Sequence, residues 1–316
     1  MAMIIVTGGA GFMGSALVWA LNERGEKDIL VVDELDHDRK ERNLAPLKYE
    51  RLIGIKEFRQ QLLAGDWDDK RVTAVLHMGA CSDTTEQNWD YLEDNNVEYT
   101  KDIIRWCADT GVRCVYASSA ATYGDGERGF DDDHELFDKL NPLNLYGKSK
   151  LLVDTWARDG GYLDSVAGLR YFNVFGPNEW HKEGMRSVIN KKFPGVNDQG
   201  KIELFKSYND KYGDGDQERD FIYVKDAVAA TLHILDNAEH SGVFNVGTGQ
   251  ARTWNDVANA MFAALEKQPN IEYINMPDHL KNQYQYHTQA DVTKLHATGF
   301  DRTLTSLEEA ITDYVQ

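Results

Sequence analysis

A tyrosine and a lysine stand four residues apart in the helix-like run from Tyr146 to Lys150. Four residues make about one helical turn, so both side chains would lie on the same face of the helix. An ammonium group beside a phenol lowers the pKa of the phenol, and such a tyrosine can exchange a proton near neutral pH. Tyrosine and lysine at this spacing are also common on exposed helices, and the pair alone favours that structural interpretation.

Two serines upstream of this pair favour the catalytic interpretation over the structural one. Ser118 and Ser119 end an apolar run that predicts a strand, and ligands bind at the carboxyl ends of strands in open α/β sheets. The serines, Tyr146 and Lys150 together therefore predict a catalytic site, in which Lys150 could also hold a nicotinamide ribose.

A glycine-rich loop follows the first predicted strand, Met3–Thr7, and contains Gly8, Gly11 and Gly14. Such glycines let the backbone turn tightly and approach a pyrophosphate, which the N-terminus of the next helix then attracts. An isolated match is a weak signal, and an ordinary tight turn would look the same. Asp33 ends the next strand about 20 residues later, which completes the pattern of a dinucleotide site.

The form of the nicotinamide cofactor stays open on these residues. Asp33 would bind the hydroxyl groups of an adenosine ribose, which favours NAD. Glu34 adds a second negative charge, which would repel the 2′-phosphate of NADP. Arg39, Lys40 and Arg42 could fold back over that phosphate, or could be solvated charges on a loop.

Apolar strand-like runs alternate with helical patterns in the first half, which predicts an α/β fold: a Rossmann-type, doubly wound parallel sheet with a smaller α/β substrate-binding lobe. We assign residues 1–172 and about 219–247 to the dinucleotide domain, and about 173–218 and 248–316 to the lobe. The acidic segment Asp210–Gln217 is assigned no role. The predicted strands are Met3–Thr7, Ile29–Asp33, Thr73–His77, Arg113–Ser118, Val166–Phe175, Asp220–Val224 and Val243–Val246. The predicted helices are Ser15–Arg24, Asp94–Thr110, Tyr146–Arg158, Asp226–Asp236, Trp254–Lys267 and Ser306–Val315.

The formal net charge of −18 repels nucleic acid, and no basic patch compensates for it. No apolar run is long enough to cross a bilayer, and no signal peptide precedes the first strand. The three cysteines form neither a disulfide framework nor a metal-ligand cluster. We therefore expect a cytoplasmic protein without membrane, nucleic-acid or metal partners.

These motifs resemble the extended short-chain dehydrogenases. Within them, the chain is similar to the family of ADP-L-glycero-D-manno-heptose 6-epimerases from Met3 to about Tyr314. The resemblance is carried by Val6–Phe12, Gly79–Ser82, Asp94–Asn96, Tyr116–Gly124, Arg170–Gly176, His181-Lys182 and Thr288–Asp291.

The resemblance implies inversion of C6 of an ADP-activated heptose without net redox change, through a transient ketone. It implies Tyr146 and Lys182 as acid/bases on the two sides of the sugar, Lys150 on the cofactor and Ser119 on the reacting oxygen. It also implies NADP, with Lys40 on its 2′-phosphate, and a homo-oligomer, a pentamer in this family.

Further site residues are carried over from the same resemblance. The cofactor positions are Phe12, Met13, Asp33, Glu34, Lys40, Lys56, Met78, Gly79, Ala80, Cys81, Ser82, Asn95, Val174 and Lys182. The substrate positions are Ser119, Asn173, Gly184, Lys191, Phe205, Arg219 and Tyr284. The chain departs from the family pattern at Glu34, Met78, Gly184 and Lys191.

Three other functions would each explain part of this pattern. Another nucleotide-sugar epimerase or dehydratase, acting on a UDP- or GDP-sugar, would share Ser119, Tyr146 and Lys150 but not Lys182. A cofactor-sensing protein would be favoured by loss of Tyr146 or Lys150, and both are present. A pure interaction protein would need neither residue at the sheet edge.

Overall fold

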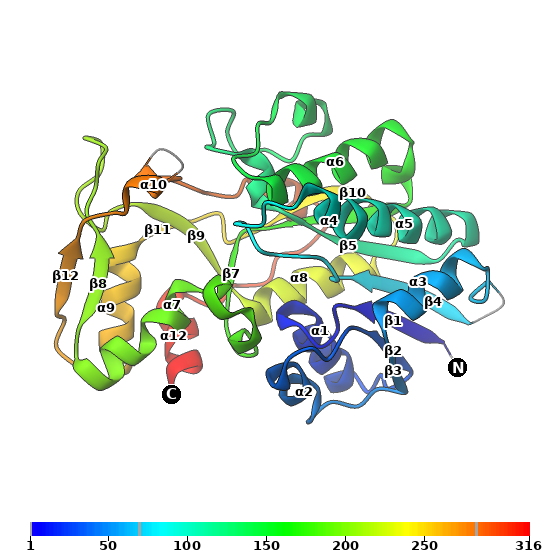
Figure 1. Cartoon of the computed structure of the whole chain (residues 1–316), viewed down its shortest axis with the longest axis horizontal. Coiled ribbons are helices and arrows are strands. Elements are labelled where there is room, and N and C mark those ends of the chain that lie inside the picture. The colour runs from blue at the N-terminus through cyan, green and yellow to red at the C-terminus, as the bar shows by residue number, and fades with distance from the viewer. Residues whose placement is uncertain (1, 69–70, 282–283) are drawn as a thin grey trace.

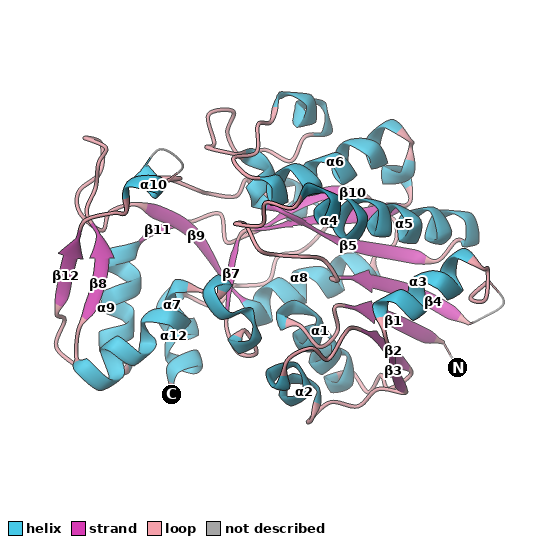
Figure 2. Cartoon of the chain, in the orientation of Figure 1, coloured by secondary structure: helices cyan, strands magenta, loops and turns pink. Residues whose placement is uncertain are grey.

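The computed structural model describes residues 2–68, 71–281 and 284–316. In Figure 1 a large lobe is built on a long twisted sheet, and a smaller lobe holds β8, β12, α9 and α12. Figure 2 shows that helices cover the strands of the large lobe from both sides.

The large lobe contains a seven-stranded sheet in the order β10-β6-β5-β4-β1-β2-β3, and its strand pairs are parallel. The remaining strands form two small sheets, one of three strands in the order β11-β9-β7 and one of two strands, β12-β8. The strands are β1 Met3–Thr7, β2 Ile29–Val32, β3 Arg51–Ile53, β4 Val72–His77, β5 Arg113–Ser119, β6 Val166–Tyr171, β7 Asn173–Phe175, β8 Ile202–Phe205, β9 Glu218–Tyr223, β10 Gly242–Val246, β11 Ala251–Thr253 and β12 Ile271–Ile274.

The α-helices connect these strands or cap the smaller lobe. They are α1 Phe12–Glu23, α2 Asp38–Leu44, α3 Ile55–Leu63, α4 Trp89–Leu92, α5 Tyr99–Thr110, α6 Leu145–Asp159, α7 Val188–Pro194, α8 Val224–Asp236, α9 Trp254–Ala264, α10 Asp278–Lys281, α11 Thr293–Ala297 and α12 Leu307–Val315. Short 3₁₀ and π-helical turns lie between some of them, including η1 Glu93–Glu98, η2 Ala120–Tyr123 and η5 Trp180–Met185.

Successive residues of each central strand enter different cores, because side chains alternate across a sheet. Val6 packs in the core that contains α1 and α8, whereas Ile5 packs in the core that contains α3, α5 and α6. A parallel sheet buried on both faces explains why these strands read as continuous apolar runs. The predicted fold class, a doubly wound parallel sheet of Rossmann type, is confirmed.

The predicted strand Val166–Phe175 is in fact two strands that belong to different sheets. β6 pairs with β5 and β10, whereas β7 pairs with β9. The chain changes sheet at Phe172, whose N–H donates to the carbonyl of Val246 at 3.0 Å. The chain therefore leaves the seven-stranded sheet at its carboxyl edge and enters the three-stranded sheet directly.

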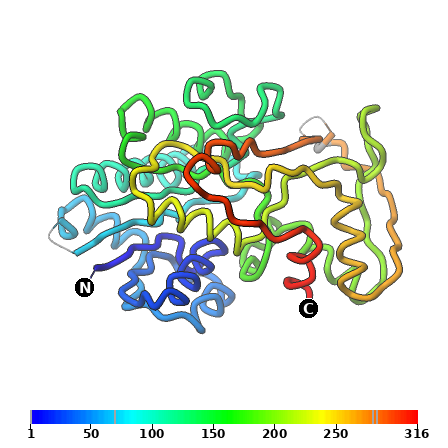
Figure 3. Tube along the Cα trace, turned by 180° about the vertical axis from the view of Figure 1, so that it is seen from behind, coloured from blue at the N-terminus to red at the C-terminus, as the bar shows by residue number. Residues whose placement is uncertain are grey.

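The C-terminal segment ties the two lobes together. Seen from behind in Figure 3, it leaves the smaller lobe, crosses to the large lobe and returns to end at α12. Lys294 in α11 donates to the carbonyl of Val243 in β10 at 2.8 Å, and α12 packs against α9. Nowhere in the described part of the chain is a helix long and apolar enough to span a membrane.

Candidate active site

A cleft of about 1240 Å³ follows the carboxyl edge of the seven-stranded sheet. Its walls come from the residues that follow β1, β2, β4 and β6, from the end of β5, and from α6 and η5. Parallel strands bring all these ends to one edge, where ligands bind in open α/β sheets.

The glycine loop forms one end of the cleft, and two of its glycines are required by the backbone. Gly8 has a φ of +64°, which side-chain-bearing residues rarely adopt. A methyl group on Gly14 would lie 2.0 Å from the carbonyl oxygen of Gly8, so only glycine allows α1 to approach the loop. α1 begins at Phe12, and the unpaired N–H groups and positive dipole of its first turn suit a pyrophosphate. These residues fit a dinucleotide.

The carboxyl end of β2 carries acids and a lysine in contact. Asp33 accepts the backbone N–H of Ala10 at 2.9 Å and pairs with the ammonium of Lys40 at 3.0 Å. Lys40 also pairs with Asp36 at 2.9 Å. The Glu34 carboxylate turns away from this group and accepts the N–H of Ile55, the first residue of α3, at 2.9 Å.

Tyr146 and Lys150 lie one turn apart in α6, and both line the cleft beside Ser119 at the end of β5. The Lys150 ammonium lies 6.0 Å from the centre of the Tyr146 ring and donates to the carbonyl of Ala117 at 2.8 Å. Burial raises the pKa of Tyr146, and Ser119 acts to lower it. Our expectation that Lys150 lowers the pKa of Tyr146 is wrong for this structure, because burial dominates and the ammonium points to a backbone carbonyl. Burial lowers the pKa of Lys150 itself to about 8.

A buried ion pair holds α6 against the sheet. Asp154, one turn after Lys150, accepts from Nε of Arg170 at 2.9 Å, and both side chains are 0% exposed. The same carboxylate accepts from the hydroxyl groups of Tyr116 and Ser118 on β5. The helix that carries Tyr146 is thus connected to two strands of the central sheet.

Lys182 enters the same cleft from η5, a segment that follows β7. Its ammonium lies 5.4 Å from the centre of the Phe12 ring at the start of α1. Burial lowers the pKa of Lys182, whereas the nearby Glu179 carboxylate acts to raise it. Glu179 is fully buried and accepts from the Ser187 hydroxyl at 2.7 Å, which closes the segment into a loop.

A second group of predicted substrate residues comes from β8, from β9 and from the segment after α10. Arg219 is buried, and its guanidinium lies 5.2 Å from the ring centre of Tyr284 and 5.7 Å from that of Trp254. Trp254 donates to the Tyr284 hydroxyl at 2.9 Å, and Phe205 packs against Tyr284 with ring centres 6.4 Å apart. Of this cluster only Trp254 lines the cleft, and Phe205, Arg219 and Tyr284 do not.

Comparison with known proteins decides the family. Residues 4–247 match the model of the NAD dependent epimerase/dehydratase family. The ADP-L-glycero-D-manno-heptose-6-epimerase of Nitratidesulfovibrio vulgaris (strain DP4) is 50% identical, in an alignment that covers 99% of this chain and 97% of that protein. The enzyme of the same name from Fusobacterium nucleatum is 44% identical with the same coverage. The chain belongs to the ADP-L-glycero-D-manno-heptose 6-epimerase family.

The solved structures agree with this assignment. The ADP-L-glycero-D-manno-heptose-6-epimerase of Helicobacter pylori has a TM-score of 0.82 at 27% identity, covering 99% of this chain and 95% of that one. The UDP-N-acetylglucosamine 4-epimerase of Methanobrevibacter ruminantium has a TM-score of 0.78 at 27% identity, covering 99% and 97%. The chain is therefore an epimerase, and the family uses a nicotinamide cofactor.

The structure brings most of the predicted site residues into one cleft. Those that line it are Gly8, Gly11, Phe12, Met13, Gly14, Asp33, Glu34, Lys40, Lys56, Met78, Gly79, Ala80, Cys81, Ser82, Asn95, Ser119, Tyr146, Lys150, Asn173, Val174 and Lys182. Gly184 and Lys191 do not line it; they contact each other instead, with the Lys191 ammonium 3.1 Å from the Gly184 carbonyl.

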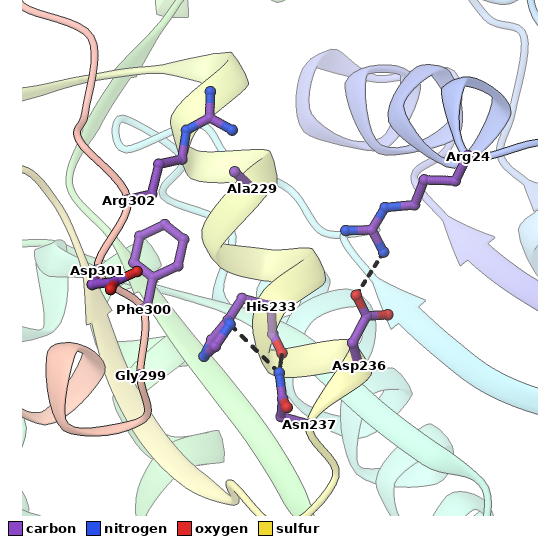
Figure 4. Close-up of a pocket in the computed structure, with 9 residues that line it drawn as sticks. All are labelled: Arg24, Ala229, His233, Asp236, Asn237, Gly299, Phe300, Asp301 and Arg302. Atoms are coloured by element: carbon purple, nitrogen blue, oxygen red, sulfur yellow. Dashed lines mark hydrogen bonds and ion pairs between the residues drawn. The ribbon is translucent and has the colours of Figure 1, made fainter.

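The structure also separates one candidate from the cleft and adds residues that the sequence did not indicate. Arg39, considered for a 2′-phosphate, lies instead over the ring of Trp180 at 5.3 Å and donates to its carbonyl at 3.0 Å. His181, Phe221 and Trp254 line the cleft, and only His181 carried a signal, as part of a quoted motif. A smaller hollow of about 320 Å³ between α8 and residues 299–302 contains none of the predicted residues (Figure 4).

Proposed function

We propose that this enzyme interconverts the two C6 epimers of ADP-glycero-D-manno-heptose, by transient oxidation at C6 with a bound NADP. The observation that carries the proposal is the convergence of two separate proton-transfer groups on one cleft. Tyr146 and Lys150 lie by β5, whereas Lys182 lies by the loop after β1, two strands away in the sheet. Acid/base groups on two sides allow a proton to be exchanged with the sugar oxygen whichever face of the planar ketone is presented.

When bound, the nicotinamide would supply the acceptor, and later the donor, of the hydride from C6. Tyr146 removes the proton of the C6 hydroxyl in one orientation of the sugar, while Ser119 holds the oxygen. Lys182 exchanges the proton when the other face of the ketone is presented. Burial lowers the pKa of Lys182, which brings its ammonium closer to the range in which it can release a proton.

The smaller lobe suits the nucleotide half of the substrate. A buried guanidinium between aromatic rings can bind a diphosphate through its donors, while the rings offer faces to a base. Arg219, Tyr284, Phe205 and Trp254 supply this combination. Together with the ADP-heptose in the names of the relatives, it supports ADP-heptose as the substrate.

NADP is proposed rather than NAD because the Lys40 ammonium lies beside Asp33, where the adenosine ribose is expected. The homo-oligomer, a pentamer, and the cytoplasmic location stay predictions from the family resemblance.

The test has two steps on the same purified protein. Denaturation releases the bound nucleotide, which chromatography identifies as NADP or NAD. A separate, native sample of the enzyme, supplied with the identified nucleotide, is then assayed with ADP-D-glycero-D-manno-heptose and with a panel of UDP- and GDP-sugars. Epimerisation at C6 of the ADP-heptose, far faster than any change in the panel, is the expected result.

A second function has specific support. The solved UDP-N-acetylglucosamine 4-epimerase shares the fold at 27% identity, and Ser119, Tyr146 and Lys150 would serve that reaction equally well. Turnover of a UDP-sugar at C4 with no action on ADP-heptose would favour this alternative and contradict the proposed function.

A further inference from the structure

His181 lies against the glycine loop, although it belongs to the segment that follows β7. A methyl group built on Gly11 would lie 3.8 Å from Nε2 of the imidazole. Gly11 precedes the first turn of α1, and both residues line the cleft. The ring thus reaches the place where the loop and the helix N-terminus would hold a pyrophosphate.

The other edge of the ring is held by Asn43 of α2. The buried Asn43 amide lies 3.4 Å from Nδ1 of His181 and donates to the carbonyls of Ala10 at 3.0 Å and Asn178 at 3.1 Å. One amide group therefore joins the glycine loop to the segment. With Nδ1 on this side, Nε2 is the nitrogen that faces Gly11.

The charges around the ring are those of an anion site. Burial lowers the pKa of His181 to about 4, and the cations of Lys40 and Lys182 act in the same direction, while Asp33 opposes them. The ring is consequently neutral near pH 7, within the influence of two ammonium groups and beside a helix N-terminus. An anion at this point would gain from all of them.

We propose that His181 is a further cofactor-binding residue, which contacts the pyrophosphate of the dinucleotide through Nε2. This inference rests on the dinucleotide site of the proposed function and extends it. Since Lys182 is the next residue, the contact would also couple the bound cofactor to the position of Lys182. A histidine that only packs on Gly11 would do neither.

Binding measurements on nucleotide-free protein test the contact without any turnover. Wild type, His181→Ala and His181→Gln are titrated with NAD, NADP and ADP-ribose, which keeps the pyrophosphate but lacks the nicotinamide. Loss of a hydrogen bond to a charged group weakens binding about 10- to 100-fold. We expect His181→Ala to lose this factor with all three ligands, and His181→Gln, which keeps an N–H donor, to lose less.

Trp180→Ala is the matched control, because its indole contacts Arg39 and Arg186 and does not line the cleft. It loosens the same segment but keeps the imidazole. A loss in His181→Ala no larger than in Trp180→Ala would overturn the proposal.

Two further patterns would also overturn it: a loss confined to NADP would place the contact on the 2′-phosphate, and unchanged binding of ADP-ribose would place it at the nicotinamide. Wild-type protein that is folded but binds none of the three ligands would refute the proposed function itself. The wild-type titrations are therefore completed before any variant is measured.

Discussion

The two groups of proposed proton-transfer residues are held in place by very different parts of the structure. Tyr146 and Lys150 lie on a 15-residue helix that Asp154 connects to two central strands through fully buried contacts. Lys182 lies on a short loop beside Glu183, whose φ of +46° is unfavourable for any residue but glycine. The first group belongs to the core of the fold, whereas the second depends on local contacts.

The loop of Lys182 is nevertheless anchored at both ends and along its outer side. Glu179 accepts from Ser187 across its base, and the ring of Trp180 contacts the guanidinium groups of Arg39 and Arg186. The backbone is strained at Glu183, and side-chain contacts hold it in that conformation. Such a segment can direct the Lys182 side chain into the cleft from outside the central sheet. We therefore expect mutations at the sheet edge to affect both stability and rate, and mutations in the loop to affect rate alone.

The largest expected effect comes from Tyr146→Phe, which removes one hydroxyl group. Loss of a positioned acid/base costs about 10²–10⁴ in rate, so turnover should fall by this factor. The released cofactor should match wild type in amount, because the ring and Lys150 remain. Turnover within a few-fold of wild type would remove Tyr146 from the mechanism.

Asp154→Ala tests the support rather than the chemistry. Removing one partner of a buried pair leaves an uncompensated charge, here Arg170, and costs about 3–5 kcal/mol of unfolding free energy. Denaturant melts measure this loss. The control is Asp236→Ala, which breaks the exposed pair with Arg24 (Figure 4) and should cost no more than about 1 kcal/mol. Equal losses in the two variants would contradict the comparison.

Local sequence pattern was sufficient to predict the first region. The continuous apolar runs of Met3–Thr7 and the neighbouring strands, the glycine loop and the one-turn spacing of Tyr146 and Lys150 are all local signals. They place the side chains on one sheet edge because parallel strands must end together.

The second region depends on contacts between residues far apart in sequence. Nothing in the residues around Lys182 shows that Glu179 binds Ser187 or that Arg39 meets Trp180, and only the family resemblance indicated Lys182. The short strands β3, β8, β11 and β12 were missed for a similar reason, since three or four residues carry too little periodicity. The split of the predicted strand at Phe172 was hidden because β6 and β7 are nearly continuous in sequence.

Lys182→Met should reduce epimerisation by about 10²-fold, at the lower end of acid/base effects, because the ammonium is lost while an apolar stem of similar length remains. Unfolding free energy should change by no more than about 0.5 kcal/mol, since the loop lies outside the core. The cofactor should stay bound.

Lys148→Met, at an exposed lysine beside Trp89, is the control and should leave the rate unchanged. An unchanged rate in Lys182→Met would refute the two-base mechanism and favour an epimerase in which one tyrosine serves both faces.

The smallest expected effect concerns the cofactor's 2′-phosphate, at the end of the cleft that both regions share. The Lys40 ammonium contacts Asp33 and Asp36, while the Glu34 carboxylate is occupied by the N-terminus of α3. The 2′-phosphate would therefore meet the Lys40 ammonium, whose charge Asp33 and Asp36 already neutralise in part. This predicts a modest NADP preference of roughly threefold to tenfold. Lys40→Ala leaves the acids unopposed, so it should weaken NADP while leaving NAD nearly unaffected. Titration of nucleotide-free wild type, Lys40→Ala and the exposed control Arg42→Ala with both cofactors measures this. If wild type prefers NAD and Lys40→Ala binds both cofactors as wild type does, Lys40 only neutralises Asp33 and Asp36, and the cofactor is NAD.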